Sequence, residues 1–177
     1  MTSRGVAVGD DAGPVLVQAT CVLIGRTAVL VRGRPGSGKS SLAAGLLQHA
    51  GSRVCIRLVA DDAVYLRPLA GRLVALCPEP ISGLLELRGI GPMPTTEIDR
   101  AVVSAVVDLV ADELVDRLPE PASAILLSVA LPRLALPERG RLNPTLLLAW
   151  LDGLRSPSAA VAPSLPDAAL PHHSIRA

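Results

Sequence analysis

Short apolar runs broken by glycine or charge alternate along the first third of the chain. Residues 15–24 and 27–32 hold aliphatic and β-branched side chains and predict two strands, joined as a hairpin by Gly25-Arg26. Apolar side chains then recur at intervals of three and four residues, which predicts a helix over residues 41–49. The chain therefore begins as strand, turn, strand and helix.

The middle of the chain continues this alternation. Runs over residues 54–60, 64–66 and 72–76 predict strands, the last two paired as a hairpin around Ala70-Gly71. Residues 78–94 contain four prolines and three glycines, and here we expect a short helix over 81–87 followed by a glycine-rich loop. Residues 101–110 are strongly β-branched and predict another strand.

The last third predicts strands over 124–131 and 134–136, and a helix over 145–154 that Pro144 is suited to begin. Strands and helices that alternate in this way predict an α/β fold, a mixed sheet with flanking helices. We expect one folded domain over residues 15–155, a flexible N-terminus over 1–14 and an Ala/Pro-rich disordered tail over 156–177.

Composition narrows the class of protein. Half of the 177 residues are apolar, but the chain has no Phe, one Trp and one Tyr, so aliphatic side chains must build the core. The formal net charge of +1 does not indicate nucleic-acid or membrane binding, and no apolar run is long enough to span a bilayer. The three cysteines, Cys21, Cys55 and Cys77, lack metal-site spacing and indicate buried thiols in a reducing compartment. With no signal peptide, these features predict a cytoplasmic protein.

Residues 33–40 read G-R-P-G-S-G-K-S, a complete phosphate-binding loop between a predicted strand and a predicted helix. Glycines let backbone N–H groups surround a phosphate, Lys39 reaches the β/γ-phosphates, and the Ser40 hydroxyl can bind Mg²⁺. A glycine-rich turn without a ligand is the alternative interpretation. The predicted nucleotide-binding residues are Gly33, Arg34, Pro35, Gly36, Ser37, Gly38, Lys39, Ser40 and Ser41.

Two further segments carry candidate chemistry. A buried-looking strand delivers the carboxylates Asp61 and Asp62 at its carboxyl end, where ligands bind in α/β sheets; one can help to hold Mg²⁺ and the other can accept a proton. Capping of a turn is their alternative role. Glu86 and Arg88 precede the glycine-rich loop and are suited to Mg²⁺ and to phosphate, or else form a solvated ion pair. Arg117 and the basic trio Arg133, Arg139 and Arg141 are weaker candidates for phosphate contact, with solvated surface arginines as the alternative.

Taken together, these three segments resemble the catalytic domain of HPr kinase/phosphorylase, in which a phosphate loop precedes Val-Ala-Asp-Asp and then Glu-Ile-Arg-Gly-Leu-Gly. The corresponding segments here are residues 33–40, 59–62 and 86–91. The chain is most similar to the short alphaproteobacterial forms, which lack the N-terminal domain of longer enzymes. The resemblance covers about residues 16–95 well and 100–150 loosely.

The resemblance implies an ATP- and Mg²⁺-dependent serine kinase of the small phosphocarrier protein HPr in a phosphotransferase-system circuit, which can reverse the reaction with inorganic phosphate. It implies that Lys39 binds the β/γ-phosphates, that Ser40 and Glu86 hold Mg²⁺, and that Asp62 is the general base, supported by Asp61. Arg88 lies within the signature, and Arg117 is the arginine implied for dephosphorylation. A homo-oligomer, a hexamer in the family, is also implied.

Two positions depart from the family pattern. Gln18 stands where the family has His, and Gln cannot shuttle a proton near neutral pH, so we expect phosphorolysis to be weaker than kinase activity. Residues 137–143 retain only part of the family segment Pro-Val-Arg-Pro-Gly-Arg-Asn, which is linked to dephosphorylation. The alternatives to the HPr kinase are a kinase for another acceptor and a nucleotide-sensing module whose catalysis has decayed.

Overall fold

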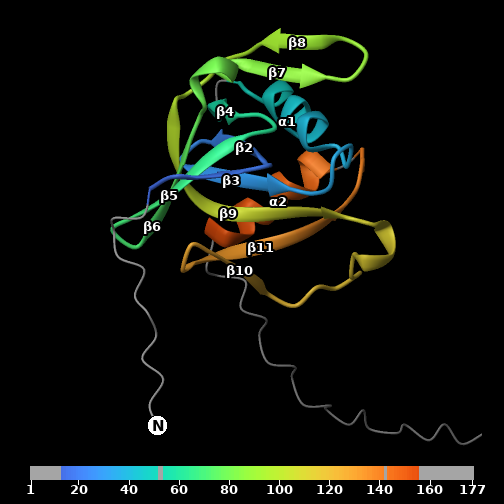
Figure 1. The fold of residues 1–177 in the computed structure, drawn as a ribbon. Coiled ribbons are helices and arrows are strands. Elements are labelled where there is room, and N and C mark those ends of the chain that lie inside the picture. The colour runs from blue at the N-terminus through green and yellow to red at the C-terminus, as the bar shows by residue number, and fades with distance from the viewer. Residues whose placement is uncertain (1–12, 52–53, 142, 156–177) are drawn as a thin grey trace, which may run out of the picture. The chain divides into compact units, whose positions relative to one another are not determined.

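The computed structural model describes residues 13–51, 54–141 and 143–155, drawn in colour in Figure 1. Most of the predicted flexible N-terminus and the whole predicted tail lie outside these residues. The chain divides into two compact units between Pro144 and Thr145, and each is described by itself. The first unit holds the sheets and the helix α1 (Lys39–Gln48).

Within the described residues the main sheet has nine strands in a mixed arrangement, so the predicted fold class is confirmed. Seven strands follow the order β1-β5-β6-β9-β3-β2-β4, while β11 pairs with β9 and β10 pairs with β11. These strands are β1 (Val15–Val17), β2 (Thr20–Ile24), β3 (Thr27–Arg32), β4 (Ile56–Ala60), β5 (Val64–Leu69), β6 (Arg72–Leu76), β9 (Arg100–Val110), β10 (Ala122–Leu126) and β11 (Val129–Pro137).

The 11-residue strand β9 organises the sheet, and it matches the β-branched run predicted as a strand. Its first residues pair antiparallel with β6, its last residues pair parallel with β11, and its other edge runs parallel to β3. Figure 1 shows β9 as a long curved ribbon through the first unit. Because β3 and β9 are parallel, their carboxyl ends lie at the same edge of the sheet, where the loop to α1 begins.

The predicted hairpins are confirmed. β2 and β3 are antiparallel, and β5 pairs with β6 around the Ala70-Gly71 turn. The apolar run over 15–24 is two strands, because the chain bends at Gln18, so that β1 pairs with β5 while β2 pairs with β3 and β4. This bend places residues that are close in sequence on separate parts of the sheet.

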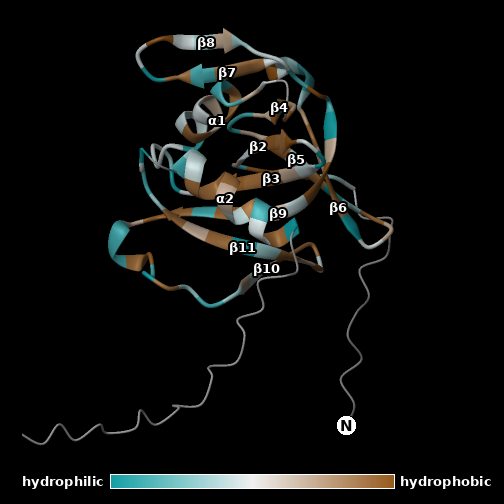
Figure 2. Cartoon of the chain, turned by 180° about the vertical axis from the view of Figure 1, so that it is seen from behind, coloured by the Kyte–Doolittle hydropathy of each residue, from teal (hydrophilic) through white to brown (hydrophobic). Residues whose placement is uncertain are grey.

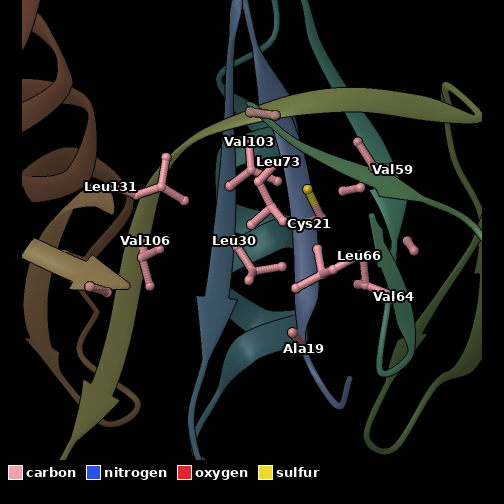
Figure 3. Close-up of a cluster of buried hydrophobic side chains, with 14 residues drawn as sticks. Ala19, Cys21, Leu30, Val59, Val64, Leu66, Leu73, Val103, Val106 and Leu131 are labelled. Carbon is pink, nitrogen blue, oxygen red and sulfur yellow. The ribbon is translucent and has the colours of Figure 1, made fainter. Parts of the chain in front are cut away.

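Aliphatic side chains form the core, as the composition predicts. Figure 2 shows β3 and β4 coloured as hydrophobic, and Figure 3 shows side chains of β2, β3, β5, β6 and β9 gathered in one interior. Leu30, Leu66 and Leu73 are buried there beside Cys21. Burial raises the pKa of the Cys21 thiol to about 12, so this cysteine packs as a small apolar side chain. Cys55, in contrast, is exposed, which corrects the expectation of a buried thiol.

The helix expected over 81–87 is wrong. A short 3₁₀ turn spans Glu79–Ile81, and residues 84–87 form the strand β7 (Leu84–Leu87), which pairs with β8 (Gly91–Pro94) in a separate two-stranded sheet. Gly83, with φ of +70°, starts the change of direction because L-residues rarely adopt that conformation. Leu85 is buried while Leu84 and Glu86 are exposed, which is the alternation of a strand.

The strand expected over 124–131 is also wrong, since it contains a hairpin turn. β10 ends at Leu126 and β11 begins at Val129, with positive φ at both Leu127 and Ser128. Two consecutive positive φ values are typical of the turns that join hairpin strands, but here no Gly or Asn marks them. The local sequence therefore lacked the usual turn signal.

The predicted helices are both present. α1 begins at Lys39, two residues before the predicted start, and α2 (Asn143–Arg155) has Pro144 in its first turn. Residues 145–155 of α2 belong to the second unit. Among the described residues, none of the helices combines the length and apolar character needed to cross a membrane.

Candidate active site

The phosphate loop connects the buried strand β3 to the first turn of α1. Gly36 and Gly38 have φ of +76° and +104°, conformations that glycine adopts without the steric cost of a side chain. Lys39 is the first residue of α1 and is only 4% exposed. Its ammonium donates to the carbonyl oxygens of Gly33 at 3.2 Å and Arg34 at 3.4 Å, so the lysine is folded under the loop where a phosphate would sit.

Asp61 follows β4 and is a buried acceptor shared by three elements. Its Oδ1 accepts from the Thr20 hydroxyl of β2 at 2.6 Å and from the Ser40 hydroxyl of α1 at 3.0 Å. Its Oδ2 accepts from the backbone N–H of Glu86 in β7 at 3.2 Å. The Asp61 carboxylate therefore joins three elements: β2, the start of α1 and the edge of β7. Sequence analysis did not single out Thr20, although a hydroxyl in an apolar strand is the signal that points to it.

Asp62, the next residue, has a different environment. It is exposed and faces the cavity beside the phosphate loop. Its φ of +62° is unusual for a residue with a side chain, and such conformations concentrate at functional sites. The sharp reversal after Asp61 turns one carboxylate into the protein and the other toward solvent.

The β7–β8 hairpin carries Glu86 and Arg88 to the same cavity. Glu86 lies in β7 and Arg88 in the turn directly after it, so the hairpin carries both charges to one side, which the expected helix would not. Both residues are exposed and line the cavity, with Gly89 and Gly91 at positive φ in the connection to β8. The hairpin is drawn above α1 in Figure 1.

The cavity has a volume of about 430 Å³ and is open to solvent. It brings together residues of the phosphate loop, the strand-end carboxylate and the hairpin signature. Its lining residues are Gly36, Gly38, Lys39, Ser40, Ser41, Asp62, Glu86, Leu87, Arg88, Gly89, Gly91 and Arg139.

Arg139, one of the weaker candidates for phosphate contact, lines the cavity from outside the three motif segments. It follows β11, and its backbone N–H donates to the Ser37 carbonyl at 2.9 Å while its Nε donates to the Gly36 carbonyl at 2.9 Å. The adjacent Glu138 accepts two hydrogen bonds from Arg34 Nε and one from Nη2, at 2.6–3.0 Å, and the hydrogen bonds from Arg34 lower the pKa of Glu138. Residues 103 and 104 positions away in sequence thus hold the outer side of the loop.

A charge network lies at the sheet edge from which the loop emerges. Asp108 of β9 accepts from Arg32 of β3 at 2.7 and 2.8 Å and from Arg133 of β11 at 2.5 Å. Burial pushes the pKa of Asp108 up, but the hydrogen bonds and positive charges of both arginines outweigh it and hold the pKa below its usual value. The network joins three neighbouring strands directly before the loop.

The remaining predicted site residues are not all gathered in the cavity. Arg34 and Pro35 are exposed on the outer side of the loop, and Ser37 is buried within it. Arg117 is exposed in the connection between β9 and β10 and is not among the residues that line the cavity. Gln18 is exposed in the bend between β1 and β2.

The donors at the cavity suit a magnesium ion that is shared with substrate. Within the described part of the chain, no three His, Cys, Asp or Glu side chains gather into a metal site. Mg²⁺ usually retains water and binds through one or two carboxylates plus substrate phosphates. The Ser40 hydroxyl beside Asp61 and the exposed Glu86 carboxylate are donors of that kind.

Comparison with known proteins gives a family match, similar curated proteins and a similar solved structure. Residues 12–100 match the family described as "HPr Serine kinase C-terminal domain". HPr kinase/phosphorylase of Clostridium tetani is 41% identical over 63 residues, which is 36% of this chain and 19% of that protein. HPr kinase/phosphorylase of Stenotrophomonas maltophilia is 42% identical over 71 residues, 40% of this chain and 21% of that protein. The match therefore spans about a fifth of the length of these curated relatives.

A solved structure is similar over most of this chain. It is titled "Structure of the Hpr(Ser) kinase/phosphatase from Coxiella burnetii", with a TM-score of 0.70 and 23% sequence identity. The alignment covers 80% of this chain and 96% of that chain. At this identity the comparison establishes the fold.

Proposed function

The chain belongs to the family of HPr serine kinase C-terminal domains, and from this premise we propose that it is an ATP- and Mg²⁺-dependent serine kinase of the phosphocarrier protein HPr. The family match reaches from residue 12 to residue 100 and so includes the phosphate loop, both aspartates and the hairpin signature. Relatives carry the name HPr kinase/phosphorylase. The activity, the acceptor and the homo-oligomer are proposals for this chain.

The observation that carries the proposal is the difference in environment between Asp61 and Asp62. A phosphate loop alone predicts nucleotide binding, but phosphoryl transfer to a hydroxyl also benefits from a base beside the transferred phosphate. Asp61 is committed to Thr20, Ser40 and Glu86, whereas Asp62 is exposed at the cavity next to the loop. This exposure supports Asp62 as the residue that would meet a protein substrate arriving from solvent.

We assign nucleotide binding to the loop and the start of α1. The backbone of the loop would surround the β-phosphate, and Lys39 would exchange its carbonyl partners for the β/γ-phosphates. Ser40 and Glu86 would hold Mg²⁺, with Asp61 keeping the Ser40 hydroxyl oriented. When bound, the ion supplies charge neutralisation for the phosphate oxygens.

In the proposed forward reaction, the seryl hydroxyl oxygen of HPr forms a bond to the γ-phosphorus. The bond between that phosphorus and the bridging β,γ-oxygen breaks, and ADP leaves with the electron pair. Asp62 accepts the hydroxyl proton, while Lys39 and Arg88 lie where charge on the transferred group can be neutralised. Positioning and electrostatics thus supply the catalysis.

In the proposed reverse reaction, an oxygen of inorganic phosphate forms a bond to the phosphorus of phosphoserine and yields pyrophosphate. The bond from that phosphorus to the seryl oxygen breaks, and the seryl oxygen leaves with the electron pair and takes a proton from Asp62. Gln18 cannot take or give a proton near neutral pH. We therefore propose that the kinase direction dominates in this protein.

The test is transfer of label from [γ-³²P]ATP to HPr in the presence of Mg²⁺. Wild type is expected to label HPr with an acid-stable phosphate, as for a seryl ester and unlike an acid-labile phosphohistidine. Lys39→Ala should abolish the label, and Asp112→Asn, an exposed carboxylate outside the cavity, should leave it unchanged. ATP binding without any labelled HPr would contradict the proposal and favour a nucleotide sensor or another acceptor.

A further inference from the structure

The segment after β11, residues 138–141, lies directly against the phosphate loop. A Cβ on Gly38 would lie 3.3 Å from the backbone nitrogen of Arg139 and 3.4 Å from its Cα, so a side chain at residue 38 would crowd this approach. The Arg139 N–H to Ser37 carbonyl bond closes the contact at 2.9 Å. The backbone of Arg139 is therefore fixed on the loop itself.

The Arg139 guanidinium lies over the loop. Its Nε is hydrogen-bonded to the Gly36 carbonyl of the loop, and its Nη groups are available for a ligand. A Cβ on Gly36 would be 3.6 Å from Arg139 Nη2 and 3.8 Å from Arg88 Nη2, so two guanidinium groups from different elements converge at this glycine. Among the described residues, neither arginine forms an ion pair with a carboxylate. Two cationic groups at the mouth of a phosphate loop suit a phosphate anion.

The segment is held in this conformation by contacts that do not involve the cavity. Asn143 is buried, and its Nδ2 donates to the Pro137 carbonyl at 2.7 Å. A Cβ on Gly140 would meet the Asn143 side-chain amide, so the absence of a side chain at residue 140 leaves room for the Asn143 contact. Arg139 itself has φ of +56°, and strained conformations of this kind persist where the surroundings impose them, often at functional sites.

From these contacts we propose that Arg139 is a further phosphate-binding residue: its backbone and Nε fix the loop carbonyls, and its Nη groups contact the nucleotide phosphates together with Arg88. The proposal rests on the nucleotide site of the proposed function. It assigns a ligand contact to a residue 103 positions after Gly36 of the loop, on a segment whose sequence retains only part of the family pattern.

The test compares ATP, ADP and AMP affinity by isothermal titration calorimetry for wild type, Arg139→Ala and Arg139→Lys, with Mg²⁺ present. Arg139→Ala should weaken ATP binding by about 10- to 100-fold, the loss of one charged hydrogen-bonding group, and AMP binding by much less. Arg139→Lys keeps the charge without the planar fork and should fall between the two. Arg141→Ala, an exposed arginine of the same segment outside the cavity, is the matched control and should bind like wild type.

Chemical rescue separates a phosphate contact from a purely structural role. Millimolar guanidinium ion should restore part of the ATP affinity of Arg139→Ala, and thermal unfolding should show that the variant folds like wild type. Equal ATP affinity in wild type and Arg139→Ala would overturn the proposal, as would an equal loss for ATP and AMP without rescue. If wild type itself binds no ATP, the proposed function fails as well, so the two failures are distinguishable.

Discussion

Two adjacent aspartates have opposite environments, and this contrast decides what each can do. Asp61 is buried and accepts hydrogen bonds from two hydroxyls and one backbone N–H. Asp62 is exposed at the cavity. Stability should therefore depend on the first carboxylate and phosphoryl transfer on the second.

Replacement of Asp61 should reveal its structural role. In Asp61→Ala, the buried Thr20 hydroxyl loses its acceptor, and the free energy of unfolding should fall by about 2–3 kcal/mol. Val has a shape similar to Thr but no hydroxyl, so Thr20→Val removes one hydrogen-bond donor. It should lower the free energy of unfolding by about 1 kcal/mol, since Ser40 and Glu86 still donate to Asp61. Urea unfolding followed by circular dichroism measures both. Asp112→Ala is the exposed control, and equal midpoints for it and Asp61→Ala would contradict the role.

Individual site residues could be predicted from sequence where a motif fixes the backbone. The glycine spacing of the loop and the strand-end position of Asp61 and Asp62 led to the cavity that the structure shows. Thr20 and Arg139 lie outside such motifs, and the signals that point to them are only a hydroxyl in an apolar strand and an arginine suited to phosphate. These local signals do not show which distant segment each side chain contacts, because those contacts are tertiary.

At the scale of elements, sequence predicted strands well where glycine or a β-branched run marked them. The β2–β3 and β5–β6 hairpins and the long β9 are confirmed. The incorrect predictions concern segments in which the turn residues or the periodicity were not those typical of a hairpin. Leu127 and Ser128 make a hairpin turn without Gly, and β7 was mistaken for a helix because its apolar residues are too few to separate the two periodicities.

The correction at β7 changes the view of the site as well as of the fold. A helix over 81–87 would have placed Glu86 and Arg88 on different faces, whereas the hairpin presents both to the cavity. The Glu86 N–H to Asp61 bond fixes the hairpin to the carboxylate after β4. The signature segment is thus a strand edge that closes one side of the phosphate site.

At the scale of the whole molecule, the family assignment that three short motifs predict is confirmed by the match over residues 12–100. The fold is confirmed by the similarity to the Coxiella burnetii structure. The domain boundaries and the oligomer stay predictions. Sequence could not predict the order of the strands, since β9 changes partners along its length and pairs with strands that precede and follow it by many residues.

The Asp108 network, which joins β3, β9 and β11, should make stability depend on acid. Its carboxyl has a pKa below the usual value in the folded protein, so its contribution is present above about pH 4, the unfolded value, and is lost as the pH falls through the folded pKa. Asp108→Asn should lower the free energy of unfolding by about 2 kcal/mol at pH 7 and flatten its decline below about pH 4. Urea unfolding at pH 7 and pH 3 measures this, and identical declines in variant and wild type would contradict it.

The most direct test of the central claim, that Asp62 is the base of a phosphoryl-transfer site, is the single-turnover rate of transfer from ATP to HPr in Asp62→Asn. Asn retains the size of the side chain and tolerates a positive φ, but it cannot accept the seryl proton. We predict an ATP dissociation constant close to that of wild type and a transfer rate lower by about 10²- to 10⁴-fold. Transfer at the wild-type rate by this variant would contradict the account.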